Sequence, residues 1–305
     1  MSSYAEVMDF DALSGLPAAQ LRQVVPSFLG GYFSVQDPGL VEETVAGAAA
    51  VLHEASDAEL KRAMSVYGAA GQHWRVHEAD PVLRALARDW MPRCMPQARV
   101  VGLERLPDDG RGCLWIGNHL SYVDTQVADS LVARAKIPCA DEVLVVAGPK
   151  AFTEPFRRVA ATALNTLMTP QSGRLEHNEH GLSQRQIAAL AVDCMESART
   201  WMTERGPLLL YPEGSRSRTG HLGSFLRATA RYSRAARLVV PVAVTGTEKL
   251  FAFDHRMRVA EVTLTIGEPF VPGAGKTAAL EQAWAALSEL LPAPYKPLPG
   301  TPVLR

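Results

Sequence analysis

The fold of this chain can be read outward from the stretch Cys113-Leu114-Trp115-Ile116-Gly117-Asn118-His119-Leu120-Ser121-Tyr122-Val123-Asp124. Its opening apolar run predicts a buried strand, and a helix-compatible segment follows Asp124. One imidazole and one carboxylate therefore fall in a loop between two regular elements, where catalytic groups are often held. His119 and Asp124 are five positions apart, a poor fit to one helical face, so a turn must fold the carboxylate back onto the imidazole if the two act together.

Apolar runs of β type recur along the chain from about residue 98. Helical patterns separate most of them, and the clearest begins at Ser183, with Gln186 at capping-box spacing, and ends at Gly206. Strands that alternate with helices predict an α/β fold with a mostly parallel central sheet flanked by helices. The β-like runs are Ala98–Leu103, Cys113–Ile116, Val143–Ala147, Leu208–Tyr211, Leu238–Val244 and Val262–Ile266.

The first 97 residues have a helical pattern, with helix starts indicated at Asp57 and at Asp80-Pro81. No cluster of chemically active side chains stands out in this part. We therefore expect an N-terminal helical domain over residues 1–97, acting as a cap or docking domain, and an α/β domain over residues 98–305. The segment from Pro92 to Pro96 is the expected boundary, and a last amphipathic helix is expected over 277–291.

The composition is that of an ordinary globular chain: 305 residues, 47% hydrophobic and 21% charged, with a formal net charge of −1. The charge is unevenly distributed. Acidic residues outnumber basic ones over residues 1–80, whereas the segment from Ser215 to Thr247 holds no Asp or Glu. This asymmetry predicts an anionic partner for the C-terminal part. The arginines of that segment are Arg216, Arg218, Arg227, Arg231, Arg234 and Arg237.

Several classes of protein are disfavoured by what the sequence lacks. The four cysteines are widely spaced, which favours free thiols in a reducing cytosol over disulfides or a zinc site. Neither a signal peptide nor an apolar run of the ~20 residues that span a bilayer is found. The nucleophile elbow, the P-loop and the dinucleotide fingerprint are also missing. The acidic and histidine residues Glu176, His177, Glu179 and His180 lie in a predicted loop, and we expect no metal site there.

A second polar loop follows the apolar run at Leu208. It reads Tyr211-Pro212-Glu213-Gly214-Ser215-Arg216-Ser217-Arg218. Glycine permits close backbone approach, and arginine is suited to phosphate or carboxylate. By itself this pattern is equally typical of a turn followed by a solvated basic segment.

Together, the H-x-x-x-x-D pattern from His119 to Asp124 and the loop from Pro212 to Ser217 resemble the glycerolipid acyltransferase family, the PlsC-like enzymes that acylate glycerol-3-phosphate or lysophosphatidate. Two softer matches are Arg99–Pro107, similar to the family's first strand, and Val239–Val242, similar to its last block. The resemblance covers roughly residues 98 to 270. The N-terminal helices and the stretch from Val146 to Pro155 are also reminiscent of soluble chloroplast-type glycerol-3-phosphate acyltransferases.

The resemblance implies transfer of a fatty acyl group from acyl-CoA or acyl carrier protein to a hydroxyl of glycerol-3-phosphate or a lysophospholipid, with no further cofactor. His119 would be the general base and Asp124 would orient it. Backbone N–H groups near Gly214 would stabilise the oxyanion. Glu213 would organise its loop, and Arg216 would bind the acceptor phosphate. The substrate-binding residues that we assign are Glu213, Gly214, Ser215, Arg216 and Lys150.

The chain departs from the family pattern at one point. The family's second block usually ends in an apolar run followed by a phosphate-binding arginine, but the corresponding stretch from Ala163 to Gln171 contains none. The cations that could replace it are Lys150, Arg157, Arg158 and Arg174. The departure leaves open whether the acceptor carries a phosphate.

Two alternative functions remain open from the sequence. One is a non-catalytic protein that binds acyl-CoA or lipid, and the other is a thioesterase with water as acceptor. For the protein itself we expect a cytoplasmic location, with peripheral contact to the inner face of an anionic membrane and no nucleic-acid partner. Arg227, Arg231 and Arg234, spaced for one face of an α-helix, could meet lipid headgroups or the phosphates of an acyl carrier, and a solvated face is equally open.

Overall fold

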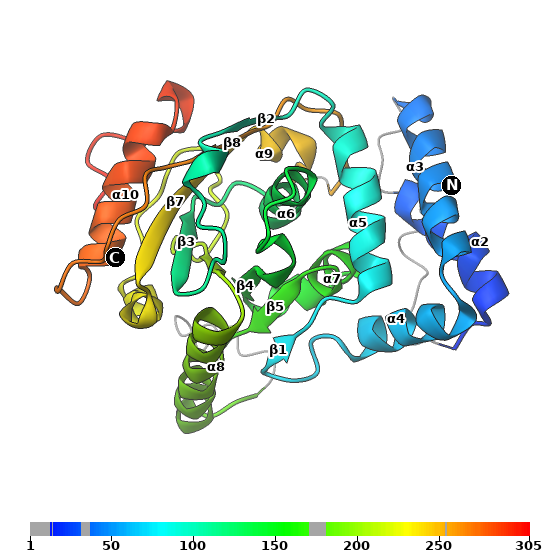
Figure 1. Ribbon diagram of the computed structural model, residues 1–305, viewed down its shortest axis with the longest axis horizontal. Coiled ribbons are helices and arrows are strands. Elements are labelled where there is room, and N and C mark those ends of the chain that lie inside the picture. The colour runs from blue at the N-terminus through cyan, green and yellow to red at the C-terminus, as the bar shows by residue number, and fades with distance from the viewer. Residues whose placement is uncertain (1–12, 14, 32–36, 171–180, 254) are drawn as a thin grey trace.

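The structure is a computed structural model that describes residue 13 and residues 15–31, 37–170, 181–253 and 255–305. Figure 1 shows a central sheet with helices on both sides and a helical N-terminal segment at the right. This confirms the α/β class and the N-terminal helices expected from the sequence. Within the described residues, no helix is long and apolar enough to cross a membrane.

The N-terminal segment contains α2 (Ala18–Gly30), α3 (Pro38–Glu54), α4 (Asp57–Ala69) and α5 (Pro81–Cys94). Both helix starts indicated by the sequence are confirmed. Ser56 caps α4 in a reciprocal capping box with Glu59. The Asp80 carboxylate caps α5 by accepting from the N–H groups of Val82 and Leu83.

The strands form one sheet in the order β1-β5-β4-β6-β3-β7-β8-β2. Strand β3 lies near its middle and pairs in parallel with β6 on one side and β7 on the other. The strands are β1 (Val76–His77), β2 (Arg99–Val101), β3 (Cys113–Gly117), β4 (Leu144–Ala147), β5 (Asn165–Met168), β6 (Leu208–Leu210), β7 (Leu238–Thr245) and β8 (Thr263–Ile266).

The direction of the strands places the two polar loops. Strands β3 to β7 all run the same way, because β4 pairs in parallel with both β5 and β6. Strands β1 and β8 are antiparallel to their neighbours β5 and β7. Since Ile116 of β3 is in register with Leu210 of β6, the loops that follow both strands emerge at the same edge of the sheet.

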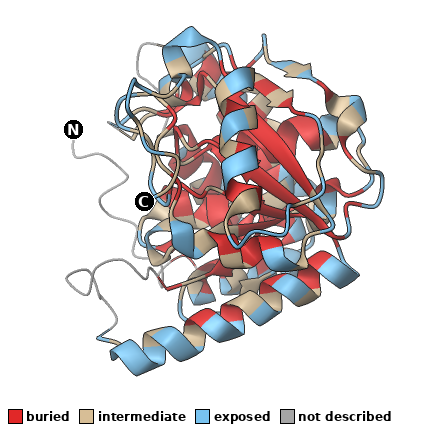
Figure 2. Cartoon of the chain, turned by 90° about the vertical axis from the view of Figure 1, so that its left-hand side faces the viewer, coloured by how far each residue is buried: buried red, intermediate tan, exposed pale blue. Residues whose placement is uncertain are grey.

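Helices cover the two faces of the sheet with separate hydrophobic clusters. Cys113 and Trp115 of β3 pack with α5, α6 (Asp124–Arg134) and α7 (Pro155–Thr162). The alternate residues Leu114 and Ile116 pack with α8 (Gln184–Glu204) and α10 (Ala278–Leu290). Figure 2 shows the buried strands between these helices. All four side chains are buried, as expected for a strand covered on both sides.

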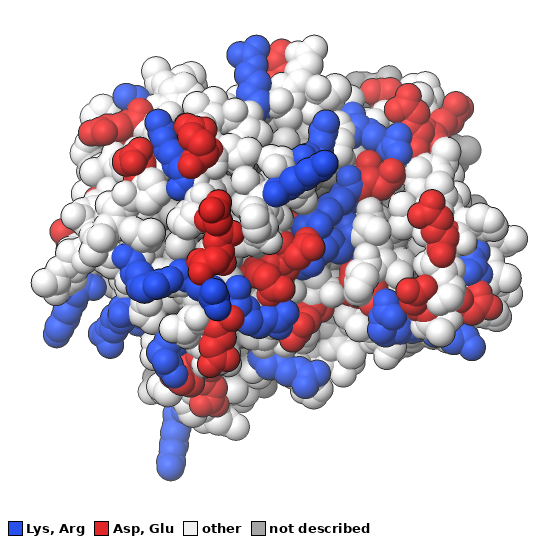
Figure 3. All heavy atoms as spheres, viewed as in Figure 1, with Lys and Arg blue, Asp and Glu red and all other residues white. Residues whose placement is uncertain are grey.

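The short elements are α9 (Thr247–Leu250) and the 3₁₀ helices η2 (Leu103–Arg105), η3 (Ala140–Glu142), η4 (Pro149–Phe152), η6 (Arg227–Ala235) and η7 (Ala293–Tyr295). The segment expected to place Arg227, Arg231 and Arg234 on one face of an α-helix is the 3₁₀ helix η6. The prediction of one shared face was therefore wrong. With three residues per turn, Arg231 and Arg234 align but Arg227 lies about 120° away. On the face seen in Figure 3, basic and acidic side chains are intermingled.

Arg88 of α5 joins the N-terminal helices to the rest of the chain. Its Nε donates to Oδ2 of Asp129 on α6, and its Nη2 donates to Oδ1 of the same carboxylate, each at 2.8 Å. Its Nη1 donates to Asp141 at 2.7 Å. A bidentate pair of this kind fixes orientation as well as distance. Strand β1 also lies in the segment expected to be helical and pairs with β5. The division into two domains at residues 97 and 98 stays a prediction.

Candidate active site

The loop after β3 is anchored to the neighbouring strand by the side chain of Asn118. Its Nδ2 donates to the carbonyl of Val244 at 2.9 Å, and its Oδ1 accepts from the N–H of Val244 at 2.8 Å. The amide therefore continues the β3–β7 ladder where the β3 backbone turns away. Asn118 is buried, and its two bonds fix the start of the loop from which His119 projects.

His119 and Asp124 are in contact. The Nδ1 of His119 lies 2.7 Å from Oδ2 of Asp124, whose side chain is 1% exposed, whereas 20% of the His119 side chain is exposed. Asp124 is the first residue of α6, where the helix dipole favours a negative charge. The two side chains meet despite being five positions apart because the chain turns at residues 120–123 and the Asp124 carboxylate caps that turn.

Asp124 accepts several other hydrogen bonds. The N–H of Leu120 donates to Oδ2 at 2.7 Å, and the N–H of Ser121 lies within 3.1 Å of both oxygens. The hydroxyl of Thr247 donates to Oδ1 at 2.5 Å. These donors match an ionised carboxylate, which can only accept. The contact therefore assigns the donor role to Nδ1 of His119 and leaves Nε2 as the ring nitrogen that can accept a proton.

Tyr211, at the end of β6, supports the imidazole ring. The two rings stack with centroids 4.7 Å apart and planes 23° apart. The Tyr211 hydroxyl lies 3.1 Å from Oγ1 of Thr125 on α6. Burial, with Asp124 nearby, raises the pKa of Tyr211, so this phenol stays neutral and acts as a packing surface.

Glu213 joins the two polar loops. Its Oε1 accepts from the N–H of His119 and its Oε2 from the N–H of Gly223, each at 2.8 Å. The residue is 4% exposed, and burial raises its pKa, while the two N–H donors act in the opposite direction. With both oxygens engaged inside the protein, Glu213 organises the loops.

Gly214 adopts a left-handed conformation with φ +68°, and an added Cβ would lie 2.3 Å from Cδ1 of Leu226. The positive φ favours glycine at this position, and a larger residue would also have to displace the end of the Leu226 side chain. Its N–H donates to the carbonyl of Tyr211 at 3.0 Å. This N–H, expected from the sequence to be among the oxyanion donors, instead closes the turn.

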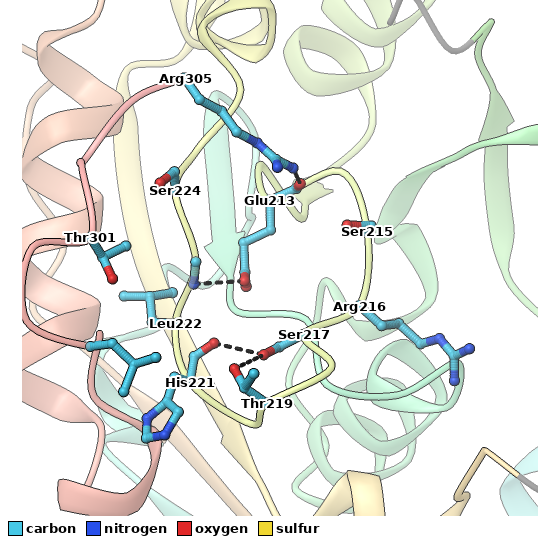
Figure 4. A pocket seen from close by; sticks show the side chains of 12 residues that line it. Glu213, Ser215, Arg216, Ser217, Thr219, His221, Leu222, Ser224, Thr301 and Arg305 are labelled. Carbon is cyan, nitrogen blue, oxygen red and sulfur yellow. Dashed lines mark hydrogen bonds between the residues drawn. The ribbon is translucent and has the colours of Figure 1, made fainter. Parts of the chain in front are cut away.

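A cavity of about 190 Å³ lies beside this loop. Glu213, Ser215, Arg216 and Ser217 line one part of it, and residues of the C-terminal tail line another. In Figure 4 the Arg305 side chain reaches the carbonyl of Glu213, and its Nη2 donates there at 2.8 Å. The position of this tail is not predictable from its sequence, since a proline-rich segment carries no signal of where it will pack. The tail residues are Leu298, Thr301 and Arg305.

The structure separates the two cations assigned to the site. The Arg216 guanidinium lies 3.6 Å from the ring centroid of Tyr122, a residue of the His119 loop, and 4.7 Å from that of Phe253. Lys150 is exposed on η4. Within residues 13, 15–31, 37–170, 181–253 and 255–305, no hydrogen bond or ion pair joins its side chain to either loop. Arg216 thus belongs to the site, and a role for Lys150 stays a prediction.

The described residues contain no group of three His, Cys, Asp or Glu side chains able to hold a metal ion. Glu176, His177, Glu179 and His180 lie outside the described residues.

Comparison with known proteins gives consistent matches. A family model described as Acyltransferase matches residues 97–245. The 1-acyl-sn-glycerol-3-phosphate acyltransferase CHLREDRAFT_174358 of Chlamydomonas reinhardtii is 22% identical over 63% of this chain and 52% of that protein. The chloroplastic 1-acyl-sn-glycerol-3-phosphate acyltransferase BAT2 of Brassica napus is 24% identical over 50% of this chain and 38% of that protein. The chain spans about half the length of these relatives, or less.

Among solved structures, the 1-acyl-sn-glycerophosphate acyltransferase PlsC from Thermotoga maritima matches with a TM-score of 0.48 and 17% identity, over 92% of this chain and 97% of that one. The matched family region contains both polar loops and ends at Thr245, the last residue of β7. Over residues 97–245, the chain therefore matches the acyltransferase family.

Proposed function

We propose that this protein is an acyltransferase that moves a fatty acyl group from acyl-CoA or acyl carrier protein to a hydroxyl of a phosphorylated glycerolipid acceptor. The observation that carries the proposal is the 2.7 Å contact between His119 Nδ1 and Asp124 Oδ2, in a loop bound to Glu213 of the second motif. The relatives' names favour a 1-acyl-glycerol-3-phosphate acceptor, and glycerol-3-phosphate is the alternative of the same class.

The reaction needs a base for the acceptor hydroxyl. The Nε2 lone pair of His119 takes the hydroxyl proton as the oxygen attacks the thioester carbonyl. Asp124 holds the tautomer and stabilises the imidazolium as it forms. The imidazolium then returns the proton to the departing thiolate. The hydroxyl oxygen forms the ester bond as the carbon–sulfur bond breaks, so no acyl-enzyme intermediate is required.

The tetrahedral intermediate carries a negative charge on the former carbonyl oxygen, which needs donors fixed in advance. Because the Gly214 N–H is engaged with Tyr211, we assign this task to the backbone N–H groups that follow it, at Ser215 and Arg216. The Arg216 side chain, held against Tyr122, binds the acceptor phosphate.

We further propose that the site faces the surface of an anionic membrane on the cytoplasmic side. Phe253 is 57% exposed and lies beside Arg216, so an apolar and a basic side chain are adjacent at the site. Sedimentation with phosphatidylglycerol vesicles should fall for Phe253→Ser. Equal sedimentation of the variant and the native protein would contradict this contact.

The function is tested with purified protein, an acyl-CoA and a panel of acceptors, with free CoA and esterified lipid both measured. We expect CoA release only when a phosphorylated glycerol acceptor is present, in equal amount to the ester formed. CoA release that does not depend on acceptor would indicate a thioesterase. Acyl-CoA binding without turnover would indicate a binding protein. Repeating the panel with acyl carrier protein identifies the donor.

A further inference from the structure

Tyr122 brings a second arginine to the candidate site. The Arg157 guanidinium carbon, from α7, lies 4.5 Å from the Tyr122 ring centroid, and that of Arg216, from the loop after β6, lies 3.6 Å from it. Tyr122 itself is between His119 and Asp124 in the chain. Figure 4 shows the Arg216 side chain directed away from the tail-lined cavity. Two permanent cations from separate elements thus converge on one ring of the catalytic loop.

Arg157 is unusually buried for a permanent cation. The residue is 8% exposed, and its Nε has no hydrogen-bond partner among the described residues. Nη2 contacts the Glu154 carboxylate and the Thr153 hydroxyl, the latter at 3.4 Å. Glu154 is itself shared, since its Oε2 lies 3.1 Å from Nδ1 of His255. Because Nε is buried and Nη2 is engaged, Nη1, which makes no hydrogen bond within the described residues, is the donor left for an anionic ligand.

The other basic residues considered from the sequence are less suitable. Arg158 donates to the carbonyl of Phe152 at 2.9 Å, and its guanidinium lies 5.8 Å from the Tyr67 ring, toward the N-terminal helices. Lys150 is exposed on η4, and Arg174 lies outside the described residues. Arg157 is the member of this set that contacts the His119 loop in the described structure.

We propose that Arg157 is the second cation of the acceptor site and, with Arg216, selects a phosphate monoester. This inference rests on the proposed function, because it assigns a ligand to the same site. A monoester carries about −1.5 to −2 charges at neutral pH, which two guanidinium groups match better than one. Arg157 is a substrate-binding residue supplied from α7, whereas the usual second-block segment of this chain, from Ala163 to Gln171, holds no basic residue.

The test compares Arg157→Gln, Arg157→Lys and Arg216→Gln with Arg158→Gln, a control that removes the same charge one position along α7. Rates are measured with lysophosphatidate and with the monoacylglycerol of the same acyl chain. We expect Arg157→Gln to raise the KM for lysophosphatidate by roughly 10- to 100-fold, the effect of losing a charge-assisted hydrogen bond. The KM for acyl-CoA should stay unchanged, and Arg157→Lys should be intermediate. Monoacylglycerol should give no CoA release with the native protein or with any variant.

The proposal is overturned if Arg157→Gln leaves the KM for lysophosphatidate unchanged, if Arg158→Gln has the same effect, or if the KM for acyl-CoA rises instead. The last result would mean that the arginines hold the phosphates of the donor. Calorimetric titration with glycerol-3-phosphate gives a readout that needs no turnover. Weaker binding to folded Arg157→Gln supports the site even if the native protein transfers no acyl group. Unchanged binding contradicts it, whatever the fate of the proposed function.

Discussion

The backbone N–H of His119 donates to Oε1 of Glu213 at 2.8 Å, across 94 positions of sequence. The N–H of Ser217 donates back to the carbonyl of His119 at 2.7 Å. The peptide groups on both sides of the imidazole are therefore held by the second motif. The two loops form one unit, so changes in the second loop should alter the position of the base.

Replacing Glu213 by Gln tests this connection. Glutamine has one acceptor oxygen, so the N–H of either His119 or Gly223 would face an NH₂ group. We expect a loss of about 1–3 kcal/mol in the free energy of unfolding, the cost of an unpaired buried group. We also expect a lower kcat with little change in acceptor KM. Urea unfolding and steady-state kinetics measure the two effects, and an unchanged kcat would contradict the role of Glu213.

The raised pKa of Glu213 predicts how the difference in unfolding free energy between the native protein and Glu213→Gln depends on pH. Its ordinary value is 4.5, and burial raises it in the folded protein. Folding therefore takes up a proton between 4.5 and the folded pKa, and the stability contributed by the protonated form is lost as pH rises through the folded pKa. The unfolding free energy of the native protein minus that of Glu213→Gln should fall over this window and then level off. A difference that increases with pH would mean that the pKa is lowered.

Asp124→Asn should reduce turnover by weakening the orientation of His119. The amide can present an N–H to Nδ1, which favours the tautomer with its proton on Nε2 and removes the lone pair that acts as base. We expect kcat to fall by roughly 10²- to 10⁴-fold. The pH–rate profile distinguishes this from a structural effect, because the acidic limb, in which the rate rises as the imidazole base loses its proton, should be lost or displaced. A pH–rate profile of native shape at lower amplitude would argue against this orienting role of Asp124.

Asn118→Ala should destabilise the protein. It would leave the N–H and the carbonyl of Val244 unpaired in a buried site, at about 1–3 kcal/mol each. Ser121→Ala is the matched comparison, since it removes only one hydroxyl donor, to the carbonyl of Phe251. A larger loss for Ser121→Ala than for Asn118→Ala would contradict the anchoring role of the amide.

The cysteines should react slowly with thiol reagents in the native state. Cys94, Cys113, Cys139 and Cys194 are all free and buried. Burial raises the pKa of Cys94 to about 12 and that of Cys139 to about 11, so little thiolate is present at neutral pH. Titration with Ellman's reagent should be fast only after unfolding in guanidinium chloride. Rapid native labelling would show that these sites are open to solvent.

The sequence was sufficient to predict the central strands and the capped helices. Those predictions rest on local signals such as the apolar run at Cys113 and the capping box at Ser183, which the structure retains with Gln186. Strands β1 and β5 were missed. Strand β1 has only two residues, Val76 and His77, and β5 lies in the stretch interpreted as the counterpart of the family's second block. Both strands form by pairing with each other across distant segments of the chain, which local sequence does not reveal.

The site was predictable in its motifs and less so in its geometry. The pairing of His119 with Asp124 follows from their pattern, but the role of Asn118 depends on Val244, 126 positions away. Arg157 and the C-terminal Arg305 are brought to the site by tertiary packing, which no local spacing reveals. The α-helical face expected for Arg227, Arg231 and Arg234 was wrong because 3₁₀ and α-helical patterns are hard to tell apart over nine residues.

The central claim is that His119 is the base of an acyl transfer that passes through no acyl-enzyme. His119→Ala tests it most directly, with His53→Ala on α3, an exposed histidine, as control. We predict that the His119 variant folds and binds acyl-CoA but transfers roughly 10²- to 10⁴-fold more slowly, while the control is unchanged. Intact mass spectrometry of the native protein during turnover should show no acyl adduct. Undiminished transfer by His119→Ala, or an acylated protein that forms at the rate of turnover, would contradict the account.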